Sequence, residues 1–206
     1  MQTLAILLLF SAFLLTRVNR LTSAVHILLV QSAMVAAVCA IEGTGSMHML
    51  VAAILTVVIK AGLIPYALLR VVRQLRHERE VNPIIGPNAS SVAAAAIIVM
   101  IYAIVDRTLP SVVSWDAVAA SLALVFIGLM LIITRRQAIL QIVGLITMEN
   151  GLYLLGLSTT HGLPLIIELG IFFDVLVAVS VLVILTYRLK KSFQSTDTSI
   201  LKKLKG

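Results

Sequence analysis

The sequence predicts an all-α integral membrane protein with seven transmembrane helices, its N-terminus outside the cell and its C-terminus in the cytoplasm. Three observations lead to this prediction. The composition is 60% hydrophobic and only 12% charged, apolar stretches approach the length of a bilayer crossing, and basic residues gather between alternate stretches. Soluble globular chains average about 45–50% apolar and about 25% charged residues, so the composition excludes a soluble domain.

Seven apolar stretches account for most of the 206 residues. They are continuously apolar and do not alternate with period two, which disfavours a β-barrel. Helices are then the only spanning structure that satisfies every backbone group in lipid. A crossing takes about 20 residues, and the first and fourth stretches fall short of this. The stretches are 2–16, 21–41, 46–69, 89–105, 116–134, 137–158 and 164–187.

These stretches group into four predicted parts. An N-terminal three-helix segment with a basic extension covers 1–88, and a fourth helix with an outer loop covers 89–115. A second three-helix segment covers 116–191, and a cytoplasmic tail covers 192–206. The first stretch is predicted to be a retained helix, because a secretory signal carries positive charge before its apolar run, whereas here Arg17 and Arg20 follow it.

The basic residues predict the orientation. Of the 16 lysines and arginines, 14 fall on one side when the loops are assigned to alternate sides, Arg107 falls on the other, and Lys60 lies inside a stretch. Basic residues accumulate in cytoplasmic loops, so the net charge of +7 indicates topology and no nucleic acid partner. The 14 are Arg17, Arg20, Arg70, Arg73, Arg76, Arg79, Arg135, Arg136, Arg188, Lys190, Lys191, Lys202, Lys203 and Lys205.

Residues 70–81 carry arginines at a spacing of three and are predicted to extend the third helix into the cytoplasm. Long basic side chains at such a helix end serve mainly to reach solvent beside lipid, and they can also form a docking surface for a cytoplasmic or membrane partner.

Ionisable residues inside the apolar stretches are the candidates for function, because a charge at the bilayer centre costs about 2.5–3.5 kcal/mol on insertion scales. At about 1.5 Å per residue, Glu149 and Asp174 lie at one depth, about 18 and 19.5 Å above the cytoplasmic face. Lys60 lies slightly lower, at about 13.5 Å, and Glu168 lies nearer the outer surface. His26 is a weaker fifth candidate.

Two interpretations of these residues remain open. In a low-dielectric interior the neutral forms of acids and amines are favoured, so such groups can gain and lose protons near physiological pH, and a neighbouring opposite charge reverses that tendency. A row of buried acids with one lysine therefore suits proton movement. Alternatively, Lys60 and one acid form an interhelical ion pair that only stabilises the fold, and His26 is a hydrogen-bonded interface residue.

Catalytic and cofactor motifs are absent from the sequence. It contains no GxxxxGK[ST] loop, no HExxH, no CxxC and no iron–sulfur or haem ligand set, and Cys39 is its only cysteine. We therefore expect a chain that is not an enzyme by itself and holds no cofactor or metal.

Small residues and one proline predict local packing. Gly128, Gly144 and Gly151 lie where close helix approach is expected. Pro65 follows Lys60 by five residues within one predicted helix and is expected to bend it there, as a hinge or as a simple kink.

The stretch from 135 to 151, with its Met-Glu-Asn-Gly at 148–151, resembles membrane component E of the hydrogenase-four type formate hydrogenlyase complexes. So does Glu168-Leu169-Gly170 followed by Asp174, as do Lys60 with Pro65 and the C-terminal Leu-Lys-Lys-Leu-Lys-Gly. The likeness covers most of the chain and is strongest from Arg135 to about Tyr187.

Residues 116–187 also resemble the small three-helix subunit of respiratory complex I, called NuoK in bacteria, and its counterpart in multisubunit cation/proton antiporters. In that family the second and third helices each carry a buried glutamate of the proton pathway. Asp174 matches the third-helix acid by position. Glu149 lies one turn beyond the second-helix position, which is Ile146 here, on nearly the same helix face.

The resemblance implies a non-catalytic membrane-arm subunit of a complex I-like energy-converting [NiFe]-hydrogenase, or a related oxidoreductase, in a bacterial or archaeal cytoplasmic membrane. Its implied partners are lipid, antiporter-like subunits, a subunit like the quinone-site subunit of complex I, and a peripheral arm with nickel–iron and iron–sulfur centres. The alternatives are a scaffold that links antiporter-like subunits without moving protons, a cation/proton antiporter subunit, and a stand-alone carrier.

Overall fold

The computed structural model describes residues 2–42, 54, 57–73, 79–80, 83–108 and 115–159. Throughout this part of the chain the regular structure is helical, apart from one isolated β-bridge. The helices are α1 (Gln2–Arg17), α2 (Leu21–Glu42), the π-helical segment η1 (Val57–Leu63), α4 (Ile64–Arg73), α5 (Pro87–Thr108), α6 (Trp115–Thr134) and α7 (Ala138–Thr159).

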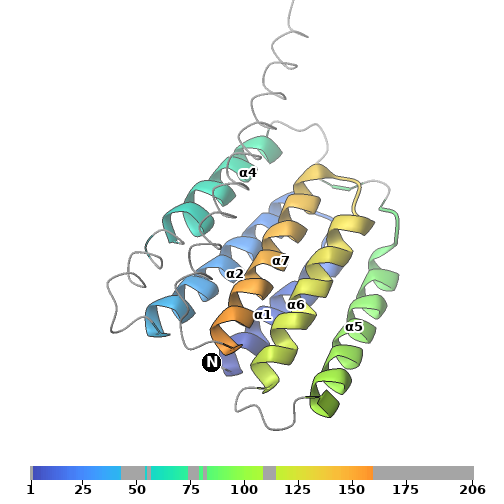
Figure 1. Cartoon of the computed structure of the whole chain (residues 1–206). Helices are drawn as coiled ribbons and strands as arrows, with labels where there is room; N and C mark the ends of the chain where they lie inside the picture. The colour runs from blue at the N-terminus through green and yellow to red at the C-terminus, as the bar shows by residue number, and fades with distance from the viewer. Residues whose placement is uncertain are drawn as a thin grey trace, which may run out of the picture.

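The helices lie roughly side by side, with α6 and α7 at the centre (Figure 1). α6 packs against α7, α5 and α1, and α7 packs against α2. α4 and η1 lie against α2, so that α4 and α5 form opposite edges of the bundle (Figure 1). The two central helices therefore have neighbours on several sides, which buries their small and polar side chains.

Length and composition agree with membrane crossing for several of these helices. Pro87–Thr108, Trp115–Thr134 and Ala138–Thr159 are each long and apolar enough to cross a membrane, and two shorter apolar helices lie within α1 and α2. Large apolar side chains face outward; Val92 and Val99 of α5 are 71% and 68% exposed. The predicted all-α membrane class is confirmed, whereas the count of seven spans and the orientation stay predictions, and the stretch 164–187 lies outside the described residues.

Glycines bring α6 and α7 into backbone contact. A Cβ atom on Gly128 would lie 2.4 Å from the amide nitrogen of Met148, and one on Gly144 would lie 2.9 Å from the carbonyl oxygen of Gly128. On Gly151 it would lie 2.8 Å from the carbonyl oxygen of Ser121. No side chain fits at these three positions without a shift, as expected for helices packed through small residues.

The helix that carries Lys60 changes form just after it. η1 ends at Leu63 and the α-helical α4 begins at Ile64, immediately before Pro65. Proline lacks the backbone N–H that would continue the ladder, and single π-helical turns often occur where that ladder is interrupted. The irregularity predicted near Pro65 is therefore a π-helical turn that contains Lys60.

The predicted extension of this helix to residue 81 is only partly correct. α4 ends at Arg73, and Arg79 pairs with Arg20 in an isolated antiparallel bridge. The amide of Glu80 donates a hydrogen bond to the carbonyl oxygen of Asn19 (3.0 Å). These backbone contacts need an extended conformation at 79–80, which a continuous helix would not provide.

A buried cluster, the Arg135–Glu80 clasp, joins the ends of three helices. The Arg135 guanidinium donates to the Glu80 carboxylate (2.9 Å), to Asn19 (3.0 Å) and to the carbonyl oxygen of Thr16 (2.6 Å) at the end of α1. The other Glu80 oxygen accepts the amide of Arg136 (2.8 Å), just before α7. Arg135 lies in the loop between α6 and α7, as its place among the basic loop residues requires, and it is only 1% exposed.

Candidate functional site: a buried lysine–glutamate pair

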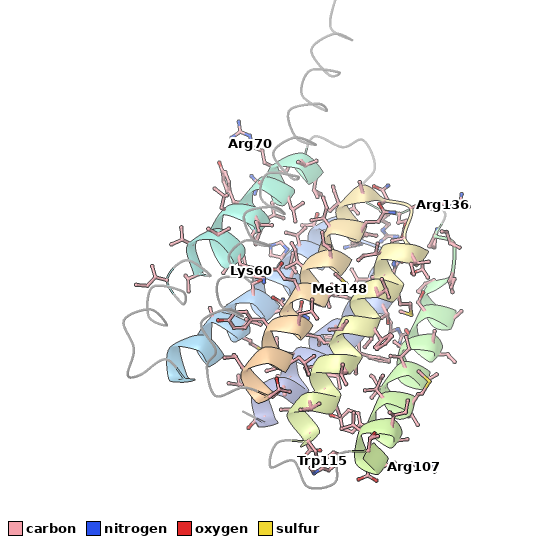
Figure 2. The ribbon with its side chains drawn as sticks, viewed as in Figure 1. Lys60, Arg70, Arg107, Trp115, Arg136 and Met148 are labelled. Carbon is pink, nitrogen blue, oxygen red and sulfur yellow. The ribbon has the colours of Figure 1, made fainter. Side chains whose placement is uncertain are left out.

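Two candidate residues from different helices meet in the interior of the bundle. Lys60 belongs to η1, which packs against α2, and Glu149 belongs to α7, which packs against α2 from another direction. Figure 2 shows Lys60 and Met148, the neighbour of Glu149, about midway between the labelled ends of the bundle. Arg70 and Arg136 mark one end, and Arg107 and Trp115 mark the other.

The pair is close and shielded from solvent. Nζ of Lys60 lies 3.0 Å from Oε1 of Glu149, and the side chains are 2% and 6% exposed. At this separation in a low-dielectric interior the two charges attract strongly, and each offsets part of the other's desolvation cost. The pair is therefore an ion pair inside an apolar bundle.

The pair forms because of how its two helices are built. Pro65 and the π-helical turn alter the register of the third helix around Lys60. The glycines of α7 hold that helix against α6 and thereby fix the position of Glu149. The depths estimated from the sequence place Lys60 slightly nearer the cytoplasmic face than Glu149, and the lysine side chain is long enough to span that difference in depth.

A hydrogen-bonded amide cluster lies on α7 next to Glu149. The Gln31 side chain on α2 lies 3.2 Å from each of three groups: the Ser11 hydroxyl on α1, the Thr147 hydroxyl and the Asn150 amide. Gln31, Thr147 and Asn150 are 0% exposed, and Ser11 is 7% exposed. This cluster, the Gln31 network, ties α1, α2 and α7 together through polar groups inside an apolar core.

The Gln31 network can be followed from donor to acceptor. The Ser11 hydroxyl donates its one proton to the carbonyl oxygen of Leu8 (2.6 Å), so it accepts from Nε2 of Gln31. Oε1 of Gln31 accepts from the Asn150 amide and from the Thr147 hydroxyl, which also lies 2.8 Å from the carbonyl oxygen of Val143.

The other predicted site residues do not join the pair in the described structure. His26 is exposed on α2, and its ring nitrogen lies 2.8 Å from the carbonyl oxygen of Thr22 in its own helix. Glu168 and Asp174 lie outside the described residues, so their predicted place beside Glu149 stays a prediction.

Two polar groupings were missed by the sequence reasoning. Gln31, Thr147 and Asn150 are uncharged and pass unnoticed in a search for charges, although three amide or hydroxyl groups in apolar helices are a signal of interhelical hydrogen bonding. Glu80 fell in the segment 70–81 that was predicted to be helical, and Arg135 was counted among the basic loop residues. Their opposite charges gave a weaker signal.

Among residues 2–42, 57–73, 79–80, 83–108 and 115–159, no group of three histidine, cysteine, aspartate or glutamate side chains is arranged to hold a metal ion. The ion pair itself is held by the opposite charges of Lys60 and Glu149, and its attraction lasts only while both side chains are charged.

The bundle and the buried pair together define a class: a helical membrane protein with an ionisable pair in its interior. Comparison with known proteins identifies the family. The family model of NADH-ubiquinone/plastoquinone oxidoreductase chain 4L matches residues 117–206. An uncharacterised protein, Rv0085, from Mycobacterium tuberculosis is 31% identical over 190 residues, which cover 90% of this chain and 86% of the relative.

Hydrogenase-4 component E from Escherichia coli K12 is 28% identical over 149 residues, which cover 71% of this chain and 69% of the relative. The protein of the same name from Shigella flexneri matches equally well. No solved structure gave a significant match. The chain belongs to the family of Rv0085. It is similar to hydrogenase-4 component E, as the motifs around 135–151 predicted, and its C-terminal region resembles chain 4L, as predicted for 116–187.

Proposed function

We propose that this chain is a membrane-arm subunit of a complex I-like energy-converting assembly of the formate hydrogenlyase type, and that it contributes buried charges to proton translocation. The observation that carries the proposal is the ion pair of Lys60 and Glu149, 3.0 Å apart and almost fully buried. The family supports the type of assembly, since relatives include hydrogenase-4 component E and the chain 4L model matches the C-terminal region.

The pair suits this function because the attraction between Lys60 and Glu149 depends on whether Glu149 carries a proton. With both groups charged, each holds the other in the apolar interior; when Glu149 takes up a proton, the lysine loses its counter-charge. A positive charge left inside the membrane is costly, so it favours proton release or a new acidic partner. The proposal assigns the next proton positions to Asp174 and Glu168, and it assigns no step to His26.

The similarity to hydrogenase-4 component E supports a proposal for the wider assembly. The proposed partners are antiporter-like subunits, a subunit like the quinone-site subunit of complex I, and a peripheral arm that holds the nickel–iron and iron–sulfur centres. In this proposal the chain holds no cofactor and catalyses no reaction alone. It crosses a bacterial or archaeal cytoplasmic membrane with its basic loops on the cytoplasmic side.

The test is Glu149→Gln in the assembled complex, with proton pumping measured per complex and per electron pair. The amide keeps the shape of the carboxyl group and cannot carry a proton, so pumping should be lost while electron transfer through the peripheral arm continues. His26→Gln is the matched control, because His26 is exposed and lies outside the pair. Undiminished pumping in a normally assembled Glu149→Gln complex would refute the proton role.

A scaffold without proton transfer is the second candidate, and the same ion pair favours it, since the pair also joins η1 to α7. A scaffold predicts a different result for Glu149→Gln: less complex is recovered, and the complex that does assemble pumps normally. A stand-alone carrier instead predicts proton flux when the purified chain alone is reconstituted in liposomes.

A further inference from the structure

Two buried side-chain oxygens, one on α2 and one on α7, have no hydrogen-bond partner in the described structure. They are Oγ of Ser32 and Oδ1 of Asn150, and both residues are 0% exposed. Burying a polar atom without a hydrogen bond is costly, so such an atom in a folded protein typically binds an ordered water molecule or another ligand. Both oxygens therefore need a hydrogen-bonding ligand inside the bundle.

The Ser32 hydroxyl differs from three other buried hydroxyls in the described helices. Those of Ser11, Ser121 and Thr147 lie 2.6, 2.8 and 2.8 Å from the backbone carbonyl oxygen three or four residues before them. Serine and threonine inside a helix commonly satisfy their hydroxyls in this way. In the described structure Ser32 does not make this bond, so its hydroxyl is able both to donate to a ligand and to accept from one.

The Asn150 amide is bound at its nitrogen and not at its oxygen. Nδ2 donates to Oε1 of Gln31 (3.2 Å) as part of the Gln31 network, and this bond holds the amide in place. Oδ1 is then the acceptor for which the described structure supplies no donor. A carbonyl oxygen only accepts hydrogen bonds, so the ligand has to donate to Asn150.

Helix geometry places Ser32 and Asn150 beside the Lys60–Glu149 pair. Gln31 and Ser32 flank the buried face of α2, because successive residues turn by about 100° and rise by about 1.5 Å. The Gln31 flank contacts α1 and α7, so the Ser32 flank faces the other neighbours of α2, which are η1 and α4 (Figure 1). η1 carries Lys60, and its partner Glu149 directly precedes Asn150. The polar side chains therefore surround the junction of α2, α7 and η1 at one depth.

Water is the ligand whose chemistry fits this junction. A metal cation also binds oxygens, but the ammonium group of Lys60 lies 3.0 Å from Oε1 of Glu149 and repels a second positive charge. An anion is repelled by Glu149 and finds no donor at Oδ1 of Asn150. Buried water typically makes about three hydrogen bonds to polar groups that are otherwise unsatisfied. One water molecule can donate to Asn150, bond to Ser32 and bond to the ion pair.

We propose that Ser32 and Asn150 hold an ordered water molecule beside the Lys60–Glu149 pair, and that this water delivers the proton to Glu149; the second part rests on the proposed function. The pair is almost fully buried, so bulk solvent does not reach Glu149 directly. The bound water takes up an incoming proton on its oxygen and gives one of its protons to Glu149. It ends as neutral water, Glu149 ends as a neutral acid, and Lys60 keeps its charge.

A density map of the full-length chain in a lipid nanodisc, at a resolution that shows ordered water, tests the site. The wild-type map should contain a water peak within hydrogen-bond distance of Ser32 and Asn150, and Ser32→Ala should lose that peak. Ser121→Ala is the matched control and should keep it, because Ser121 is equally buried and its hydroxyl already donates to the carbonyl oxygen of Val118.

Three results from these maps would overturn the site. Direct contact between the Ser32 and Asn150 side chains, with no peak between them, would show that the two groups satisfy each other. An unchanged peak in Ser32→Ala would show that Ser32 does not hold the water. A peak that appears only in sodium buffer, and not in potassium or choline buffer, would show a cation site.

Unfolding by sodium dodecyl sulfate gives a second measurement that needs no map. Ser32→Ala and Ser121→Ala gain the same helix propensity, so the difference between them reports on the two hydroxyls. If the Ser32 hydroxyl binds water, both variants lose a hydrogen bond, and Ser32→Ala should unfold no later in the titration than Ser121→Ala. If the hydroxyl is buried without a ligand, its removal relieves a desolvation cost. An unfolding midpoint of Ser32→Ala above those of wild type and Ser121→Ala would therefore also overturn the site.

Proton delivery is tested in the assembled complex. Ser32→Ala should slow proton pumping severalfold, and Ser121→Ala should leave it unchanged. Normal pumping in Ser32→Ala, where Glu149→Gln abolishes pumping, would overturn delivery by this water and leave the proposed function in place. A water peak in the wild-type map, together with normal pumping in Glu149→Gln, would refute the proton role and leave the site. The proposed function and the water site can therefore fail separately.

Discussion

Nζ of Lys60 lies 3.0 Å from Oε1 of Glu149, and this contact links a π-helical turn to a regular α-helix inside the bundle. The two partners depend on different local structures. Lys60 lies where Pro65 interrupts the helical ladder, and Glu149 lies on a helix held by glycine contacts. A change in either local structure would therefore act on the charge pair, which is the property that the proposed proton role needs.

A double-mutant cycle on this pair gives the first prediction. Lys60→Met or Glu149→Leu alone leaves one charge buried without its partner and should lower the free energy of unfolding by about 3–5 kcal/mol. The double variant removes both desolvation costs together and should lose clearly less than the sum of the two. Unfolding in mixed micelles by titration with sodium dodecyl sulfate measures all four proteins. Strict additivity of the two losses would contradict a direct interaction.

The second prediction concerns the Arg135–Glu80 clasp. Glu80→Gln leaves the Arg135 guanidinium without its charge partner, and Arg135 is 1% exposed, so this variant should lose about 3–5 kcal/mol of unfolding free energy. Arg135→Lys should also destabilise, because one ammonium group cannot reach Glu80, Asn19 and the α1 carbonyl oxygens from a single position.

Arg136→Gln is the matched control for the clasp. Arg136 is the next residue, is exposed, and contributes only its backbone amide to Glu80, so its side chain should matter by less than about 0.5 kcal/mol. The same titration in mixed micelles compares the three variants. A loss for Arg136→Gln as large as that for Glu80→Gln would show that general charge at this end, and not the clasp, provides the stability.

Sequence reasoning predicted the helices well because the signal for them is long and continuous. The stretches 21–41 and 116–134 became α2 and α6 almost residue for residue. Lys60 and Glu149 were also identified from the sequence, since a charge in an apolar stretch is conspicuous. Whether these two residues pair was left open. The position of a residue along a helix gives its depth in the membrane, but it does not give the direction in which the side chain points around the helix axis.

The contacts that sequence reasoning missed join distant segments. Arg135 was counted as a basic loop residue, and only the fold brings Glu80 and the end of α1 to it. The extension through 79–80 looked helical by its arginine spacing, yet the bridge to Arg20 required extended backbone. A local pattern cannot reveal either partner, so these errors come from tertiary structure overriding local preference.

The third prediction tests the contact between α6 and α7. Gly128→Ala places a methyl group 2.4 Å from the backbone of Met148, so the helices must separate, and a loss of about 1–3 kcal/mol or more is expected. Gly86→Ala is the control, since nothing lies within 4 Å of a Cβ atom there. Thermal unfolding in detergent compares them. Equal melting temperatures for both variants would mean that α6 and α7 do not pack through Gly128.

The fourth prediction concerns the Gln31 network, in which Gln31 accepts from Thr147 and Asn150 and donates to Ser11. Gln31→Leu removes the acceptor of the buried Asn150 amide and the donor to Ser11, which should cost about 1–3 kcal/mol of unfolding free energy. Gln31→Glu keeps an acceptor but loses the donor to Ser11 and buries a charge when ionised, so it should be no better. His26→Leu, on the exposed side of the same helix, should change stability by less than about 0.5 kcal/mol. If Gln31→Leu proved as stable as wild type in the same titration, the network would be a coincidence of packing and Asn150 would be held by α7 alone.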